Sequence, residues 1–82
     1  MVHIAFFLHK SITARGDKAT MRVRPNKIFI SIYRNGCKIY NIMISEGRPP
    51  VYNFLNLYWV DSMDAARKFI MELDEKALLQ MR

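Results

Sequence analysis

The side chains best suited to chemistry in this 82-residue chain are basic residues interspersed with aromatic ones. Lys and Arg bind phosphate groups, and aromatic rings stack on unpaired bases. The candidate nucleic-acid-binding residues are Arg22, Arg24, Lys27, Tyr33, Arg34, Lys38, Tyr40 and Arg48. In this interpretation the basic side chains bind phosphate, while the two tyrosines stack on the nucleic acid or orient it.

The formal net charge of +6 is unevenly distributed along the chain. Residues 1–60 contain nine Lys or Arg and two acidic residues, whereas residues 61–82 contain four Lys or Arg and five acidic residues. The positive charge therefore belongs to the first part of the chain. We expect an anionic partner, either nucleic acid (DNA more than RNA) or an acidic protein surface, with solubility alone as the remaining explanation.

Catalytic and metal chemistry find little support in the sequence. One cysteine and two distant histidines do not match the usual zinc spacings, and the three isolated glycines form no phosphate-binding loop. No Ser/His/acid or Cys/His grouping is visible, and Cys37 is interpreted as an inert thiol. We expect a protein that is not an enzyme and has no cofactor.

The compartment is inferred from the cysteine count and the N-terminus. A single cysteine cannot form an internal disulfide, which is typical of a reducing interior. The apolar N-terminal run lacks the basic segment and cleavage site of a signal peptide, and no run is long enough to span a bilayer. We expect a single small domain over residues 1–82, soluble and cytoplasmic, without a membrane partner.

Three apolar runs of strand length are expected to position the candidate residues. Within residues 27–33, isoleucines alternate with Phe, Ser and Tyr, which makes this the clearest strand. Asn35-Gly36 predicts a two-residue hairpin turn into a second strand over residues 37–44. After Pro49-Pro50, residues 51–60 are apolar on both faces, as in a central or covered strand.

The flanking segments are predicted as follows. Residues 2–8 alternate in a way that suits a strand, with a short helix as the alternative, and residues 11–20 read as a loop. Residues 21–24 predict a short strand or extended arm that carries two outward arginines and ends at Pro25. Asp61-Ser62 begins a helix whose buried stripe is Ala66, Phe69, Ile70, Leu73 and Ala77.

These elements predict an α+β fold class, with an antiparallel sheet of three to five strands and one C-terminal helix packed on one face. Within that arrangement, two sets of residues carry a family resemblance. The first is the hairpin Arg34-Asn35-Gly36-Cys37-Lys38-Ile39-Tyr40, followed by Ile42-Met43-Ile44 and Gly47-Arg48. The second is the helix start Val60-Asp61-Ser62-Met63-Asp64-Ala65-Ala66.

With these features, residues 33–66 resemble the small DNA-binding domains of tyrosine-type integrases and the plant APETALA-type domains. In those families three antiparallel strands lie in the major groove, and a helix braces them. The resemblance implies that Arg34, Lys38, Tyr40 and Arg48 face DNA.

The alternative is a protein-binding regulator or inhibitor of the kind that phages and other mobile elements encode. It would dock on its partner through an apolar or edge-strand surface. A homodimer is a further alternative. The aromatic run 52–59, the six methionines and the pair Met71/Leu78 favour this alternative. One contiguous basic face with exposed tyrosine would favour nucleic acid, whereas scattered charge with an exposed apolar patch would favour a protein partner.

Overall fold

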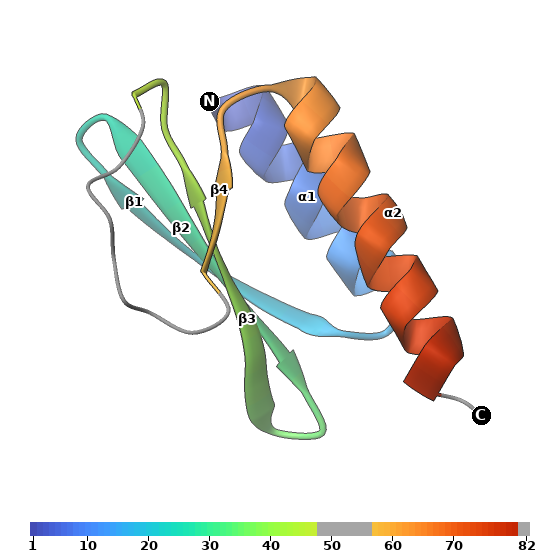
Figure 1. Ribbon diagram of the computed structural model, residues 1–82. Helices are drawn as coiled ribbons and strands as arrows, with labels where there is room; N and C mark the ends of the chain where they lie inside the picture. Colours follow the sequence, from blue (N-terminus) through green and yellow to red (C-terminus); the bar gives the residue numbers. More distant parts are fainter. Residues whose placement is uncertain (48–56, 81–82) are drawn as a thin grey trace.

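The computed structural model describes residues 1–47 and 57–80, with side chains described as far as residue 75. The elements in chain order are helix α1 (Val2–Ala14), strands β1 (Lys18–Arg24), β2 (Lys27–Arg34), β3 (Cys37–Ile44) and β4 (Leu57–Val60), and helix α2 (Met63–Gln80) (Figure 1). Residues 51–56 of the third predicted strand, and Arg48, lie outside the described residues.

The four strands form one sheet in the order β1-β2-β3-β4. The first three strands form an antiparallel meander, whereas β4 runs parallel to β3, with Asn41 opposite Leu57 and Ile44 opposite Val60. The predicted α+β class is confirmed, and the sheet is antiparallel except for this last pair. A parallel neighbour requires a long return of the chain, and residues 45–56 supply that length.

The N-terminal segment is a helix, so the prediction of a strand over residues 2–8 is wrong, and the loop predicted from residue 11 begins only after Ala14. Ala5, Leu8 and Ile12 are at most 1% exposed and lie three and four residues apart, which places them on one helical face. The alternation over residues 2–8 is too short to distinguish a strand from a helix. Gly16, with φ +87°, then turns the chain into β1.

Both helices pack on the same face of the sheet, as Figure 1 shows. The C-terminal helix is confirmed on that face, and α1 lies beside it. Strands β2 and β3 contribute their alternating isoleucines to the core between sheet and helices: Ile28, Ile30, Ile32, Ile42 and Ile44. Because strand side chains alternate between faces, the intervening residues stand on the side away from the helices, which we call the outer face.

Helix α2 begins as predicted. The hydroxyl oxygen of Ser62 accepts a hydrogen bond from the backbone N–H of Ala65 at 3.2 Å, which caps the first turn. The described members of the predicted stripe are buried, namely Ala66, Phe69, Ile70 and Leu73. Met71 is exposed, and the side chains of Ala77 and Leu78 lie outside the described residues.

Two short turns set the register of the first three strands. Asn35 and Gly36 both have positive φ, at 54° and 79°, which confirms the predicted hairpin turn between β2 and β3. The predicted break at Pro25-Asn26 is a second two-residue turn, with Asn26 at φ 64° and Arg24 paired with Lys27. The predicted arm over residues 21–24 is therefore the end of a longer strand.

A β-bulge changes which face Lys38 occupies. Ile32 pairs with Tyr40, but the next residue, Tyr33, pairs with Lys38, so Ile39 is an extra residue in β3. Strict alternation predicts Lys38 on the face of Tyr40. The bulge instead places Lys38 opposite Tyr33.

Candidate nucleic-acid interface

The outer face of β1 and β2 is built from four cross-strand rows. In the antiparallel register, Lys18 lies opposite Tyr33, Thr20 opposite Ser31, Arg22 opposite Phe29, and Arg24 opposite Lys27. These residues alternate with the ones that face the helices, such as Met21 and Ile30. Three of the predicted basic residues, Arg22, Arg24 and Lys27, are thereby brought together at one end of the hairpin.

Phe29 organises this end of the face. The guanidinium carbon of Arg22 lies 5.7 Å from the ring centroid, and the Lys27 ammonium lies 5.9 Å from it. Cations at these distances are attracted by the negative face of an aromatic ring. We call Arg22, Arg24, Lys27 and Phe29 the hairpin cluster. Two cations lie near the same ring, so an anion at this end of the face can meet more than one positive charge.

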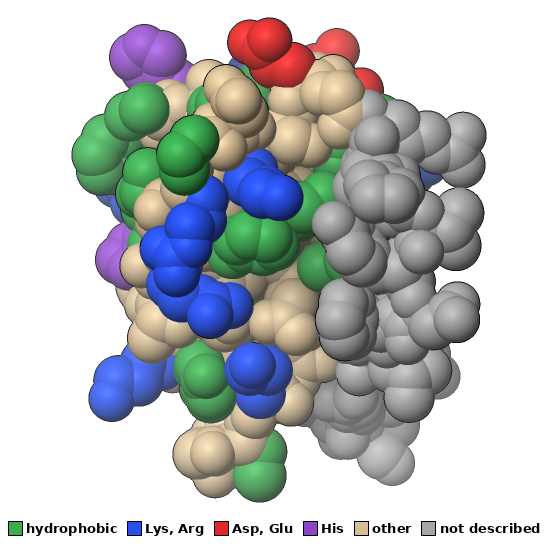
Figure 2. All heavy atoms as spheres, turned by 90° about the vertical axis from the view of Figure 1, so that its left-hand side faces the viewer, with side chains coloured by type: hydrophobic (Ala, Val, Ile, Leu, Met, Phe, Trp, Pro, Cys, Tyr) green, Lys and Arg blue, Asp and Glu red, His purple; other side chains and the backbone are tan. Residues whose placement is uncertain are grey.

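The strands that form most of the outer face are rich in basic residues. Residues 18–44, which make up β1 to β3, contain six Lys or Arg and no Asp or Glu. Figure 2 shows Lys and Arg side chains gathered over this face, with acidic side chains at its upper margin. A surface of one charge sign attracts oppositely charged ligands and speeds their association.

Arg34, a predicted phosphate-binding residue, forms an ion pair with Asp17. It donates from Nε to Asp17 Oδ1 and from Nη2 to Asp17 Oδ2, both at 2.9 Å. These hydrogen bonds raise the pKa of Arg34, and the Asp17 side chain is only 6% exposed. The charge of Arg34 is therefore balanced inside the protein, where it joins the end of β2 to the start of β1.

Tyr40 lies on the helix side of the sheet, away from the hairpin cluster. Its ring makes edge contacts with Tyr58 and Phe69, at centroid distances of 5.4 Å and 6.1 Å. Tyr58 and Phe69 are 4.9 Å apart, so the three rings pack together between β3, β4 and α2. This position gives Tyr40 a packing role.

The second end of the outer face gathers around Tyr33. The neighbouring strands place Lys18 and Lys38 opposite it, one on each side. Tyr33 and Lys38 were predicted from the sequence, whereas Lys18, Thr20 and Phe29 were missed. Lys18 and Thr20 fell in a segment interpreted as a loop. Extending the alternation of Arg22 and Arg24 backwards by two and four residues would have found both.

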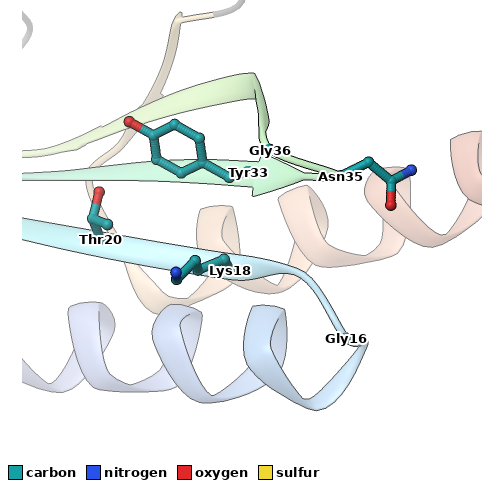
Figure 3. Close-up of a pocket in the computed structure, with 6 residues that line it drawn as sticks. All are labelled: Gly16, Lys18, Thr20, Tyr33, Asn35 and Gly36. Atoms are coloured by element: carbon teal, nitrogen blue, oxygen red, sulfur yellow. The ribbon is translucent and has the colours of Figure 1, made fainter.

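A hollow of about 510 Å³ opens at this end. It is lined by Gly16, Lys18, Thr20, Tyr33, Asn35 and Gly36 (Figure 3). Figure 3 shows the Thr20 and Tyr33 side chains on neighbouring strands, with Asn35 pointing away from the Tyr33 ring. The hollow thus combines an ammonium group, two hydroxyl groups and one aromatic ring.

The β3–β4 half of the outer face has a different character. Trp59 donates from Nε1 to Ser45 Oγ at 3.1 Å, and Ser31 Oγ donates to Asn41 Oδ1 at 2.9 Å. Met43, on the same face, is buried. These polar groups are satisfied within the protein. Among the described residues of the sheet, the groups suited to an external anion therefore concentrate on β1 and β2 and at Lys38.

A comparison with known protein families, curated proteins and solved structures found no match to this chain. Within the described residues, no three His, Cys, Asp or Glu side chains gather in a way that could hold a metal ion. Neither described helix is long and apolar enough to cross a membrane.

Proposed function

We propose that this protein binds nucleic acid through the outer face of β1 and β2, without catalysing a reaction. The observation that supports the proposal is the hairpin cluster, which holds Arg22, Arg24 and Lys27 on one surface of an acid-free sheet segment. Lys18 and Lys38 extend the same charge towards Tyr33. We also propose that the nucleic acid is DNA, as the sequence resemblance implies, and that the protein is cytoplasmic.

The charges predict how binding should depend on salt. Lys and Arg displace condensed counterions from phosphates, so the logarithm of affinity falls linearly with the logarithm of salt concentration. Arg34 is left out because Asp17 balances its charge. If the five remaining cations of the face each meet a phosphate, the slope is about −3.5 on single strands and about −4.5 on duplex DNA.

Fluorescence anisotropy with labelled duplex DNA, single-stranded DNA and RNA, at two salt concentrations, tests the proposal. The test variant is Arg22→Glu/Arg24→Glu. The matched control is Arg67→Glu/Lys68→Glu, which makes the same charge change at exposed positions of α2. We expect the test variant to lose at least about tenfold in affinity, and the control far less.

No binding of any of the three nucleic acids at low salt would overturn the proposal. Equal losses in the test and control variants would also overturn it, because overall charge and not the outer face would then determine affinity. The preferred nucleic acid would identify the class of partner.

The second candidate is a protein-binding regulator, and one observation favours it. Strand β1 lies at the edge of the sheet, and two exposed apolar side chains belong to β1 and the helix that contacts it: Val23 (65% exposed) and Phe6 (64% exposed). An open edge strand can pair with a strand from another chain. Phe6→Ser/Val23→Ser separates the candidates, because these neutral changes remove both apolar side chains and should leave nucleic-acid binding through the outer face intact.

A further inference from the structure

We infer that the hollow beside Tyr33 binds one nucleotide unit of an unpaired nucleic-acid strand, with the phosphate at Lys18 and Thr20 and the base against the Tyr33 ring. This inference rests on the proposed function and narrows it to single strands. It is carried by the chemistry of the lining residues, by the position of Tyr33 between two lysines, and by the hollow's size.

Lys18 and Thr20 form the phosphate end of the site. They are two residues apart on β1, so both side chains stand on the outer face. An ammonium group offers three N–H donors and a hydroxyl offers one more, which suits the several oxygens of a phosphate. Within the described part of the chain, neither side chain makes a hydrogen bond or ion pair that would compete with a ligand.

Tyr33 forms the base end. Its residue is half-buried, which holds the ring in place while leaving part of it accessible. Lys18 and Lys38 lie opposite Tyr33 on the two neighbouring strands, so a base on this ring has a cation on each side for its flanking phosphates. Aromatic side chains within positively charged grooves bind single strands in this way, independently of base identity.

The turn that borders the hollow is open at Gly36. Gly36 has φ +79° in the turn beside Tyr33, and a Cβ placed there would meet nothing within 4 Å. Asn35 points away from the Tyr33 ring (Figure 3). The turn therefore leaves an open approach to one face of the site, and the volume of about 510 Å³ falls within the usual range for small-ligand sites.

The bound nucleic acid is inferred to be single-stranded because a base can stack on Tyr33 only if one face of the base is free. In a duplex each base is stacked between its neighbours, so a ring on a flat sheet cannot reach its face without unstacking it. Phe29 is the other outer ring of β2, and the charged groups of Arg22 and Lys27 already lie over this ring, where a base would stack. It lies four residues from Tyr33, about 13 Å at strand rise, far more than the spacing of stacked bases. Tyr33 is thus the stacking position, and the hairpin cluster receives phosphates further along an extended strand.

The test compares Tyr33→Leu with the matched variant Tyr33→Phe, which keeps the ring. The probe is a fluorescein-labelled single-stranded oligonucleotide, with the corresponding duplex and a 5′-mononucleotide as competitors. We expect Tyr33→Leu to lose about fivefold or more in single-strand affinity, Tyr33→Phe to lose little, and duplex affinity to change little. Thermal melts of both variants establish that each is folded.

The outcomes separate this inference from the proposed function. If Tyr33→Leu leaves single-strand affinity unchanged while Arg22→Glu/Arg24→Glu weakens binding, the hollow is not a base site, although the proposed function stands. If the free mononucleotide binds as tightly as the oligonucleotide, the ligand is a nucleotide and not a strand, which also overturns the inference. If no nucleic acid binds to the wild type, both fall.

A second measurement does not depend on any variant. Titration of the single strand into 15N-labelled protein should shift the backbone amide signals of Gly16, Thr20 and Gly36 before those of α2. Shifts confined to the hairpin cluster, or to the helices, would place the strand elsewhere and overturn the assignment of the hollow.

Discussion

Asp17 accepts two hydrogen bonds from the guanidinium group of Arg34, one on each carboxylate oxygen at 2.9 Å. Asp17 directly precedes β1 and Arg34 is the last residue of β2, so the pair closes the end of this strand pair opposite the Pro25-Asn26 turn. Lys18 and Tyr33, which line the hollow, are the next residues inward on the two strands. The ion pair therefore fixes the geometry of the candidate site without contributing a free charge to it.

Arg34→Gln should lower stability and leave the salt dependence of nucleic-acid binding unchanged. The substitution leaves the nearly buried Asp17 carboxylate without its bidentate partner, which costs about 1–3 kcal/mol. Urea unfolding followed by Trp59 fluorescence measures the change in the free energy of unfolding. Unchanged stability, together with a shallower dependence of affinity on salt concentration, would show that Arg34 binds a phosphate of the nucleic acid.

Arg22→Gln should leave stability nearly unchanged and should weaken the salt dependence of nucleic-acid binding. Arg22 is exposed on the outer face, where it lies over the Phe29 ring and makes no hydrogen bond or ion pair with a described side chain, so stability should change by about 0.5 kcal/mol or less. The salt slope should become shallower by about 0.7–0.9, the contribution of one phosphate contact. Anisotropy titrations at four or more salt concentrations measure this slope. A slope equal to that of the wild type would remove Arg22 from the interface.

The parts of the fold that the sequence predicted are those decided by neighbouring residues. Strand β2 follows from the alternation of Ile28, Ile30 and Ile32, and its turn follows from Asn35-Gly36, because both depend on local backbone preference. Helix α2 is likewise marked by its cap and stripe.

The remainder depends on contacts between distant segments. Nothing within residues 57–60 indicates that β4 pairs in parallel with β3, since a strand's pairing direction is set by its partner. The bulge that moves Lys38 to the face of Tyr33 arises between strands, as does the capture of Arg34 by Asp17. The last two of these contacts place Lys38 on the outer face and pair Arg34 with Asp17, so the candidate site could be predicted only in part.

The contact between the helices should depend on pH. Arg15 donates to both carboxylate oxygens of Asp74 on α2, with Nη2 and Oδ2 2.7 Å apart, and these hydrogen bonds lower the pKa of Asp74 below its ordinary value of 3.8. A carboxyl group whose pKa is depressed by folding stabilises the protein above its unfolded-state pKa. That contribution is lost as the pH falls through the folded-state pKa.

Asp74→Asn should therefore destabilise the protein at pH 7, by about 0.2–1 kcal/mol because the pair is partly exposed. The difference from wild type should shrink as the pH falls below about 4 and the wild-type carboxyl becomes protonated. Urea midpoints of both proteins across this range measure it. A difference that persists undiminished at pH 2 would show that the pair's charge is not what joins α1 to α2.

The last prediction concerns helix α1, for which the alternation of residues 2–8 had predicted a strand. Leu8 is fully buried against the sheet, whereas Phe6, two residues away, is 64% exposed. Leu8→Ala should lower the free energy of unfolding by about 2–5 kcal/mol, since it leaves a cavity in the core. Phe6→Ala should change it by about 0.5 kcal/mol or less. In a strand, positions 6 and 8 would share a face and both substitutions would matter, so equal losses in urea unfolding would contradict the helix.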